Sequence, residues 1–204
     1  MNDYKYPPLT VTRKTGAEQF TGANVSKRLI DYWMWAHSNM CSNAERGKFA
    51  EYIVSLAMNA ADGVGDEWGA YDVLSPEGIR IEVKTSAYIQ TWGQKTFSRI
   101  VFGIKPTREL DEWTNQYYDE AKRQSDVYVF CVENCKDQSE LNPLDLDQWD
   151  FYPVSTALLN EKLGDQKSIS LVSLENLEVS LCKYAELRKE IIEQYRKYHE
   201  TDIG

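Results

Sequence analysis

Two carboxylates and a lysine stand close together in the sequence: Asp72, Glu82 and Lys84. Carboxylate oxygens bind hard cations and take part in acid–base chemistry, and an ammonium group stabilises negative charge that develops during a reaction. These side chains can act together only if the chain brings them to one surface. The residues between them therefore decide whether the set is a candidate site.

A β-hairpin is the structure expected between them. Ser-Pro-Glu-Gly at 75–78 has the chemistry of a type I turn, with proline at the second position and glycine where a positive φ is needed. Such a turn gives a three-residue loop and places Asp72 opposite Glu82. Directly opposed residues share a face, as do alternate residues along one strand. The two carboxylates, Arg80 and Lys84 are therefore expected on one side of the hairpin.

An ordinary hairpin with this pattern has a solvated face, on which Glu82 and Lys84 form a surface ion pair. Three further features favour a functional site. A helix that precedes the hairpin supplies additional carboxylates. The alternation continues after Lys84 with polar and aromatic residues typical of a groove, namely Ser86, Tyr88, Gln90 and Trp92. Residues 83–108 contain no acid and five basic residues: Lys84, Lys95, Arg99, Lys105 and Arg108.

The helix expected over 42–59 carries two candidate glutamates. Ser42-Asn-Ala-Glu45 has the pattern of a capping box, in which the Glu45 side chain reaches back to the backbone of Ser42. Glu51 lies in the middle of the helix beside small residues, which allow close packing on a sheet. Because the capping box accounts for Glu45, we favour Glu51 as the helix carboxylate of the site.

The whole chain is expected to form a mixed α/β domain, because its hydrophobic period alternates between that of helices and that of strands. We expect a mixed central sheet flanked by helices, with a long C-terminal helix. A single domain is predicted, with an irregular lead-in over 1–24, a core over 25–172 and a C-terminal helix over 173–204. Helices are expected over 25–37, 42–59, 109–124, 155–163 and 175–198, and strands over 71–74, 79–84, 100–104, 126–133, 151–154 and 168–172.

The ordered set of motifs resembles the PD-(D/E)XK nuclease superfamily, which includes many restriction endonucleases. The central elements are Asp72, nine intervening residues and then Glu82-Val83-Lys84, preceded by a helix that contains Gly47-Lys48-Phe49-Ala50-Glu51. The proline that gives the superfamily its name is absent, because a tyrosine precedes Asp72. The resemblance covers about residues 26–175. Over this range the longer pattern of motifs is similar to that of a group of bacterial proteins with this core. Its other segments are 33–36, 46–47, 50–52, 67–68, 71–72, 85–86, 90–92, 126–130 and 149–152.

This resemblance implies a restriction-endonuclease-like core and a metal-dependent nuclease that hydrolyses phosphodiester bonds, with DNA as the expected substrate. Asp72, Glu82 and the carbonyl of Val83 match the ligands of Mg²⁺, and Mn²⁺ is an alternative cation. The cation polarises the scissile phosphate and lowers the pKa of a bound water. Lys84 matches the residue that orients this water and stabilises the developing negative charge.

The resemblance also suggests roles for side chains around that centre. Glu51 matches an accessory acid on the helix. Gln90 resembles a catalytic glutamine that follows the Glu-x-Lys element in some branches, and a plain polar groove residue is an equally good interpretation. Arg80, Lys95 and Arg99 are expected to contact nucleic acid.

Two other interpretations stay open. One is a catalytically silent nuclease-fold protein that acts as a binding or regulatory module in phage defence or a mobile element, although the intact set of Asp72, Glu82 and Lys84 argues against it. The other is a junction resolvase, which needs a dimer with a broad basic face that the sequence does not show. The apolar seam of the C-terminal helix could support a homodimer or pack onto its own domain.

The charge of the 204 residues is divided unevenly. A net charge of -9 excludes a general nucleic-acid coat protein, whose domain is strongly basic. Residues 1–108 contain 13 Lys and Arg against 11 Asp and Glu, a net charge of +2, whereas residues 109–204 contain 10 against 21, a net charge of -11. We therefore expect local, salt-sensitive DNA binding by the first half. A protein partner is expected to meet the acidic second half.

The first residues contain no apolar stretch typical of a signal peptide, and no run approaches the ~18 apolar residues that a membrane span needs. We therefore expect a cytoplasmic protein without membrane association. Its four cysteines are then expected to be reduced. With only two histidines in the chain, Cys131-x-x-x-Cys135 has few partners for a zinc site.

Overall fold

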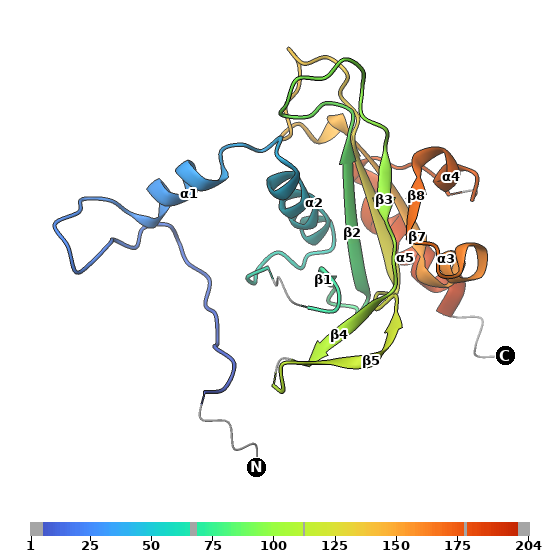
Figure 1. The fold of residues 1–204 in the computed structure, drawn as a ribbon, viewed down its shortest axis with the longest axis horizontal. Coiled ribbons are helices and arrows are strands. Elements are labelled where there is room, and N and C mark those ends of the chain that lie inside the picture. Colours follow the sequence, from blue (N-terminus) through green and yellow to red (C-terminus); the bar gives the residue numbers. More distant parts are fainter. Residues whose placement is uncertain (1–5, 66–68, 112, 178, 200–204) are drawn as a thin grey trace.

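The computed structural model describes residues 6–65, 69–111, 113–177 and 179–199, so the motif residues 67–68 lie outside it. The described elements form a mixed α/β fold, as expected (Figure 1). In chain order they are α1 (Leu29–His37), α2 (Asn43–Ala57), β1 (Val73–Leu74), β2 (Arg80–Ala87), β3 (Val101–Gly103), β4 (Thr107–Asp111), β5 (Gln116–Lys122), β6 (Val127–Glu133), η1 (Leu146–Gln148), β7 (Trp149–Ser155), α3 (Thr156–Leu163), β8 (Ser168–Ser170), α4 (Leu171–Glu175) and α5 (Tyr184–His199).

The central sheet has four strands in the order β1-β2-β6-β7. Strand β2 pairs in parallel with β6, and the β1–β2 and β6–β7 pairs are antiparallel, so the sheet is mixed. All seven residues of β6 are buried, which fits a central strand covered on both faces. The sheet order places β1 and the edge of β2 at one side of the domain, where the candidate residues lie.

Two apolar clusters cover the two faces of this sheet. On one face, α2 and α5 pack against Ile81, Val83 and Val129. On the other face, β3, β8, α3 and α4 pack against Phe130 and Tyr152. Figure 1 shows α2 on one side of the sheet and α3 and α4 on the other. Among the described helices, none combines the length and the apolar character that crossing a bilayer requires.

The prediction of a helix over 109–124 is wrong, because this segment forms the antiparallel hairpin of β4 and β5. The Asp111 carboxylate accepts hydrogen bonds from the backbone N–H groups of Trp113 and Thr114 at 2.9 and 3.3 Å. The Asn115 N–H donates to the Asp111 carbonyl at 2.8 Å, and Asn115 has a φ of 53°. These local bonds close a turn that competes with the helix, and asparagine tolerates the left-handed conformation better than most residues.

The continuous C-terminal helix expected from residue 175 is also wrong, because α4 ends at Glu175 and α5 begins at Tyr184. Between them Cys182 exchanges two backbone hydrogen bonds with Phe151 of β7, at 3.0 and 2.9 Å, which requires extended backbone. Leu187 and Ile191 of α5 are fully buried against the domain's own sheet. The apolar seam of this helix is therefore occupied within the chain, and a homodimer through it is not supported.

The N-terminal part of the described chain lies apart from the sheet. Helix α1 begins at Leu29, later than expected, and has no buried residue. Figure 1 shows α1 and the segment before it projecting away from the body of the domain. The expected strand over 168–172 is shorter than predicted, since α4 begins at Leu171. The alternation expected to continue through Trp92 also ends early, because β2 stops at Ala87.

Candidate active site

The β1–β2 hairpin has the register that its turn predicts. Val73 pairs with Ile81, and the N–H of Asp72 donates to the Ile81 carbonyl at 3.0 Å. The turn is closed by the Gly78 N–H, which donates to the Ser75 carbonyl at 2.9 Å, with Gly78 at a φ of 83°. A residue with a side chain is strained at this φ, so glycine is needed here.

Because β1 is so short, the edge of β2 is open at Val83. The Val83 N–H would be unpaired there, and the Asp72 carboxylate accepts its hydrogen bond at 2.7 Å. The N–H and C=O of one strand residue point to the same side, so the Val83 carbonyl faces this edge as well. The Asp72 carboxylate and the Val83 carbonyl thus both lie at the unpaired edge of β2.

Glu82 and Lys84 lie on the opposite face of β2 from the apolar Ile81 and Val83. They form an ion pair, with side chains that are 20 % and 33 % exposed respectively. Burial raises the pKa of Glu82, and the neighbouring Asp72 carboxylate raises it further, while Lys84 acts in the opposite direction. In the parallel register Glu82 is paired with the buried Tyr128 of β6, which forms part of its apolar surroundings.

Of the two candidate glutamates on α2, the structure brings Glu51 to the hairpin. Burial raises the pKa of Glu51, the Lys48 ammonium at 2.8 Å lowers it, and the charge of Asp72 raises it. Glu45 instead lies 2.9 Å from Nδ1 of His37. Only half of the expected capping box is present. Ser42 Oγ accepts from the Glu45 N–H at 3.3 Å, but the Ser42 N–H donates to the Asn39 carbonyl at 3.0 Å and not to the Glu45 carboxylate.

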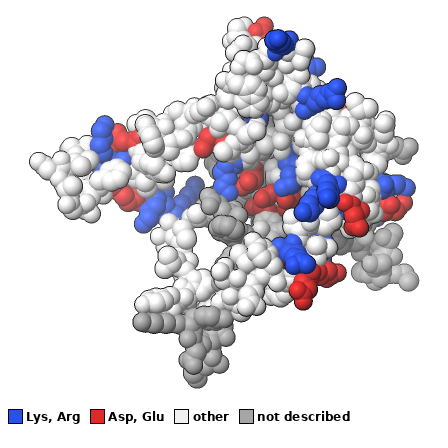
Figure 2. Space-filling view, viewed as in Figure 1, with Lys and Arg blue, Asp and Glu red and all other residues white. Residues whose placement is uncertain are grey.

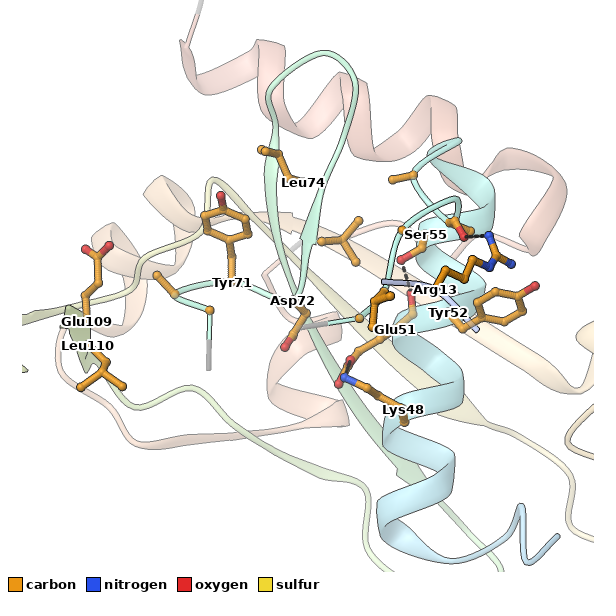
Figure 3. Close-up of a pocket in the computed structure, with 18 of the residues that line it drawn as sticks. Arg13, Lys48, Glu51, Tyr52, Ser55, Tyr71, Asp72, Leu74, Glu109 and Leu110 are labelled. Atoms are coloured by element: carbon orange, nitrogen blue, oxygen red, sulfur yellow. Dashed lines mark hydrogen bonds and ion pairs between the residues drawn. The ribbon is translucent and has the colours of Figure 1, made fainter. Parts of the chain in front are cut away.

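A cavity of about 750 Å³ opens beside the carboxylates of Glu51 and Asp72. Glu51 of α2 and Asp72 of the hairpin border it on one side, and Glu109 and Leu110 of β4 border it on the far side (Figure 3). Arg13 of the N-terminal segment also lines the cavity and donates to the carbonyls of residues 61 and 62. Figure 2 shows acidic side chains gathered between basic ones in the hollow between the N-terminal segment and the body.

The side-chain chemistry fits a hard cation that keeps part of its water shell. Asp72 Oδ2 and Glu82 Oε1 are engaged by the Val83 N–H and by Lys84. Among the described residues, the second oxygen of each carboxylate has no hydrogen-bond partner and can act as a ligand. No group of three or more His, Cys, Asp and Glu lies close enough in the described part of the chain to bind a metal by protein side chains alone. Water would complete the coordination, as is usual for Mg²⁺.

The other expected site residues lie at different places. Arg80 is engaged by Asp126, with Nη2–Oδ1 and Nε–Oδ2 distances of 2.5 and 3.1 Å. Gln90 lies in the loop after β2, where its Nε2 donates to the Ala87 carbonyl at 2.9 Å. Lys95 lies in the same loop, and Arg99 is exposed just after it.

One buried group, the Arg46 guanidinium, has no clear signal in the sequence. Arg46 and Glu133 are each 1 % exposed, and their ion pair spans 3.7 Å. Arg46 also donates to the Cys41 carbonyl, Asn43 and Gln90. Arginine and glutamate are rarely buried unless they are paired, and residues 46 and 133 lie far apart in the sequence. Only the fold identifies them as partners.

A comparison with curated proteins finds no match to the chain. The model of the family described as bacteriophage T4 endonuclease IV matches residues 27–173, which is more than two thirds of the chain. The matched segment contains α2, the β1–β2 hairpin and the whole central sheet. The chain therefore belongs to the bacteriophage T4 endonuclease IV family, a family of nucleases.

Proposed function

We propose that the protein is a Mg²⁺-dependent endodeoxyribonuclease whose centre is of the PD-(D/E)XK type. The observation that carries the proposal is the hairpin geometry, in which Asp72 closes the open edge of β2 beside Glu82 and Lys84. Membership of a nuclease family supports the reaction class. Mn²⁺ is a plausible replacement, because it accepts the same oxygen ligands.

In this proposal Asp72, Glu82 and the Val83 carbonyl hold the cation. When bound, Mg²⁺ neutralises charge on the scissile phosphate and lowers the pKa of a bound water. Lys84 orients the attacking water and stabilises the negative charge that develops on the phosphate. Glu51, beside Asp72 and with a raised pKa, is placed to accept or return a proton as an accessory acid.

The test is a cleavage assay on plasmid, single-stranded and branched DNA and on RNA, with Mg²⁺, Mn²⁺ or EDTA. We expect metal-dependent DNA cleavage that Asp72→Asn abolishes while the variant still melts cooperatively. Asp119→Asn on the exposed strand β5 is the matched control and keeps wild-type activity. Metal-independent cleavage, or full activity of Asp72→Asn, contradicts the proposed centre.

A catalytically silent module remains the competing proposal and makes a distinct prediction. Such a protein shows no cleavage of any of these substrates and no heat of binding for Mg²⁺ or Mn²⁺ in calorimetric titration. Metal binding that disappears in Glu82→Gln argues for the nuclease.

A further inference from the structure

The loop that follows β2, residues 88–98, is held in shape by hydrogen bonds among its own residues. We refer to it as the tryptophan loop. Its ends are joined by the Ser98 N–H, which donates to the Tyr88 carbonyl at 3.0 Å. Inside it, Gln94 Oε1 accepts from the Gln90 N–H at 2.7 Å, and Gln94 Nε2 donates to the Tyr88 carbonyl and to Ser98 at 3.1 Å each. The Gln94 side chain thus links the two sides of the loop and fixes its shape.

Buried groups attach this loop to the rest of the domain. Gln90 Oε1 accepts from Arg46 Nη2 at 3.0 Å, and the same guanidinium forms the ion pair with Glu133 at the end of β6. Tyr88 packs edge to face on Phe97, with ring centroids 6.1 Å apart. A loop fixed in this way loses little conformational freedom when it binds a ligand, which favours affinity.

The cavity of the tryptophan loop has the chemistry of a nucleotide site. Its volume is about 640 Å³. Trp92 and Phe97 are 58 % and 53 % exposed at its border, and large exposed aromatic rings of this kind stack on nucleobases. Lys95 and Lys136 also line it, and no acidic side chain is among the described residues that border it. The amides of Gln90 and Gln94 are engaged inside the protein. Thr91, Thr96 and Gln138 add hydroxyl and amide groups of the kinds that hydrogen-bond to base edges.

The loop is continuous with the strand that carries the proposed catalytic centre. Gln90 is the sixth residue after Lys84, and this length of chain spans no more than about 22 Å. A nucleotide held in the loop and a phosphate at Lys84 can therefore belong to one nucleic-acid strand. The local charge supports this, because residues 83–108 are basic in a chain whose net charge is -9.

We propose that the tryptophan loop and Lys136 form a nucleotide-binding subsite, separate from the scissile phosphate. In this subsite a base stacks on Trp92, and the two lysines neutralise the adjoining phosphates. The proposal rests on the proposed nuclease function for its substrate and extends it by naming a second contact on the same strand. Gln90 then acts as a positioning residue of the loop through its bonds to Arg46 and Ala87.

Binding without cleavage is the first test. Fluorescence anisotropy of labelled 12-nucleotide DNA and RNA oligonucleotides in EDTA is compared between the wild type, Trp92→Ala, Trp92→Phe and Tyr117→Ala. We expect Trp92→Ala to weaken binding about tenfold and Trp92→Phe to retain most of it, since stacking needs only an aromatic face. Tyr117 is also 58 % exposed and lines none of the described cavities, so Tyr117→Ala is the matched control with unchanged affinity.

Comparison of the affinities for the DNA and RNA oligonucleotides shows which of the two nucleic acids the subsite prefers. The proposal is overturned if wild-type protein binds neither oligonucleotide, or if Trp92→Ala binds as tightly as wild type. Thermal melting of each variant checks that the fold is retained, and recovery of binding in Trp92→Phe separates stacking from folding.

A small substrate distinguishes this subsite from the catalytic centre. Bis(p-nitrophenyl) phosphate contains a phosphodiester but no nucleotide. We expect Trp92→Ala to hydrolyse it at the wild-type rate, while KM for an oligonucleotide rises and kcat changes little. Equal losses on both substrates would place Trp92 in the catalytic centre and overturn the subsite. If wild-type protein hydrolyses neither substrate, the proposed nuclease function fails, and the binding comparison still decides the subsite.

Discussion

The carboxylate centre, which includes Glu82 and Lys84 of β2, and the tryptophan loop, which follows the end of β2, differ in their electrostatics. At the centre, burial and the nearby charge of Asp72 raise the pKa values of Glu51 and Glu82. At the tryptophan loop, Lys95 and Lys136 line the cavity, the lining residues that the structure describes include no acid, and the Gln90 and Gln94 amides are paired inside the protein. A phosphate is repelled at the first region until a cation binds, whereas the second attracts it directly. The difference suggests that chemistry and substrate binding are separable in this nuclease.

The sharpest test of this separation is Glu82→Gln. We expect metal-dependent cleavage to fall by at least about a thousandfold, because a bound metal ion contributes several kcal/mol of charge stabilisation. Affinity for a 12-nucleotide oligonucleotide in EDTA is expected to stay within about twofold of wild type, or to increase, since a negative charge is removed. Single-turnover kinetics and anisotropy measure the two effects. Glu161→Gln on the exposed side of α3 is the control. A parallel loss of binding would contradict the separation.

Two lysines allow a matched comparison within the carboxylate centre. Lys84 contacts Glu82, and Lys48 contacts Glu51 at 2.8 Å. We expect Lys84→Met to lower kcat about a hundredfold, as the loss of one group that stabilises transition-state charge does in other enzymes. Lys48→Met is expected to have a much smaller effect, because Lys48 pairs with the accessory acid Glu51 and not with a proposed metal ligand. Similar losses in both variants would show that Lys84 has no special role.

Arg46→Met tests the connection between the loop and the fold. The variant leaves Glu133 buried without its partner, which is expected to lower the free energy of unfolding by about 3 kcal/mol in urea denaturation. The double variant Arg46→Met/Glu133→Leu is expected to recover much of this stability. Oligonucleotide binding should stay weak in both, because Gln90 has lost its bond to Arg46. Restored binding in the double variant would show that the loop does not depend on Arg46.

The smallest expected effect is a pH dependence of stability. Burial raises the pKa of Glu51 in the folded protein, so the folded state binds a proton more readily than the unfolded state. This carboxyl therefore contributes most stability below the ordinary pKa of glutamate, and the contribution is lost as pH rises through the raised value. Without metal, we expect Glu51→Gln to be more stable relative to wild type at pH 8 than at pH 5. Urea denaturation at the two pH values measures this, and an unchanged difference would contradict it.

The β1–β2 and β4–β5 hairpins show where sequence reasoning succeeded and where it failed. For β1–β2, a short turn with proline and glycine set the register, and the observed pairing of Val73 with Ile81 confirms it. For β4–β5, a polar segment without a strong apolar period was interpreted as a helix. Its turn depends on bonds from Asp111 and on Asn115 at positive φ, which many sequences of this composition do not form. The mixed α/β fold was predictable because most apolar periods were clear.

The sequence by itself determined that Asp72, Glu82 and Lys84 share one hairpin, because turn chemistry and strand alternation are local properties of the chain. The tertiary structure decided which glutamate of α2 lies beside Asp72, since this depends on how a helix packs against a sheet. It also decided that Arg46 and Glu133 are partners and that Gln90 supports a loop. These contacts join residues distant in sequence, and desolvation determines which charges must pair. No local pattern encodes such pairing.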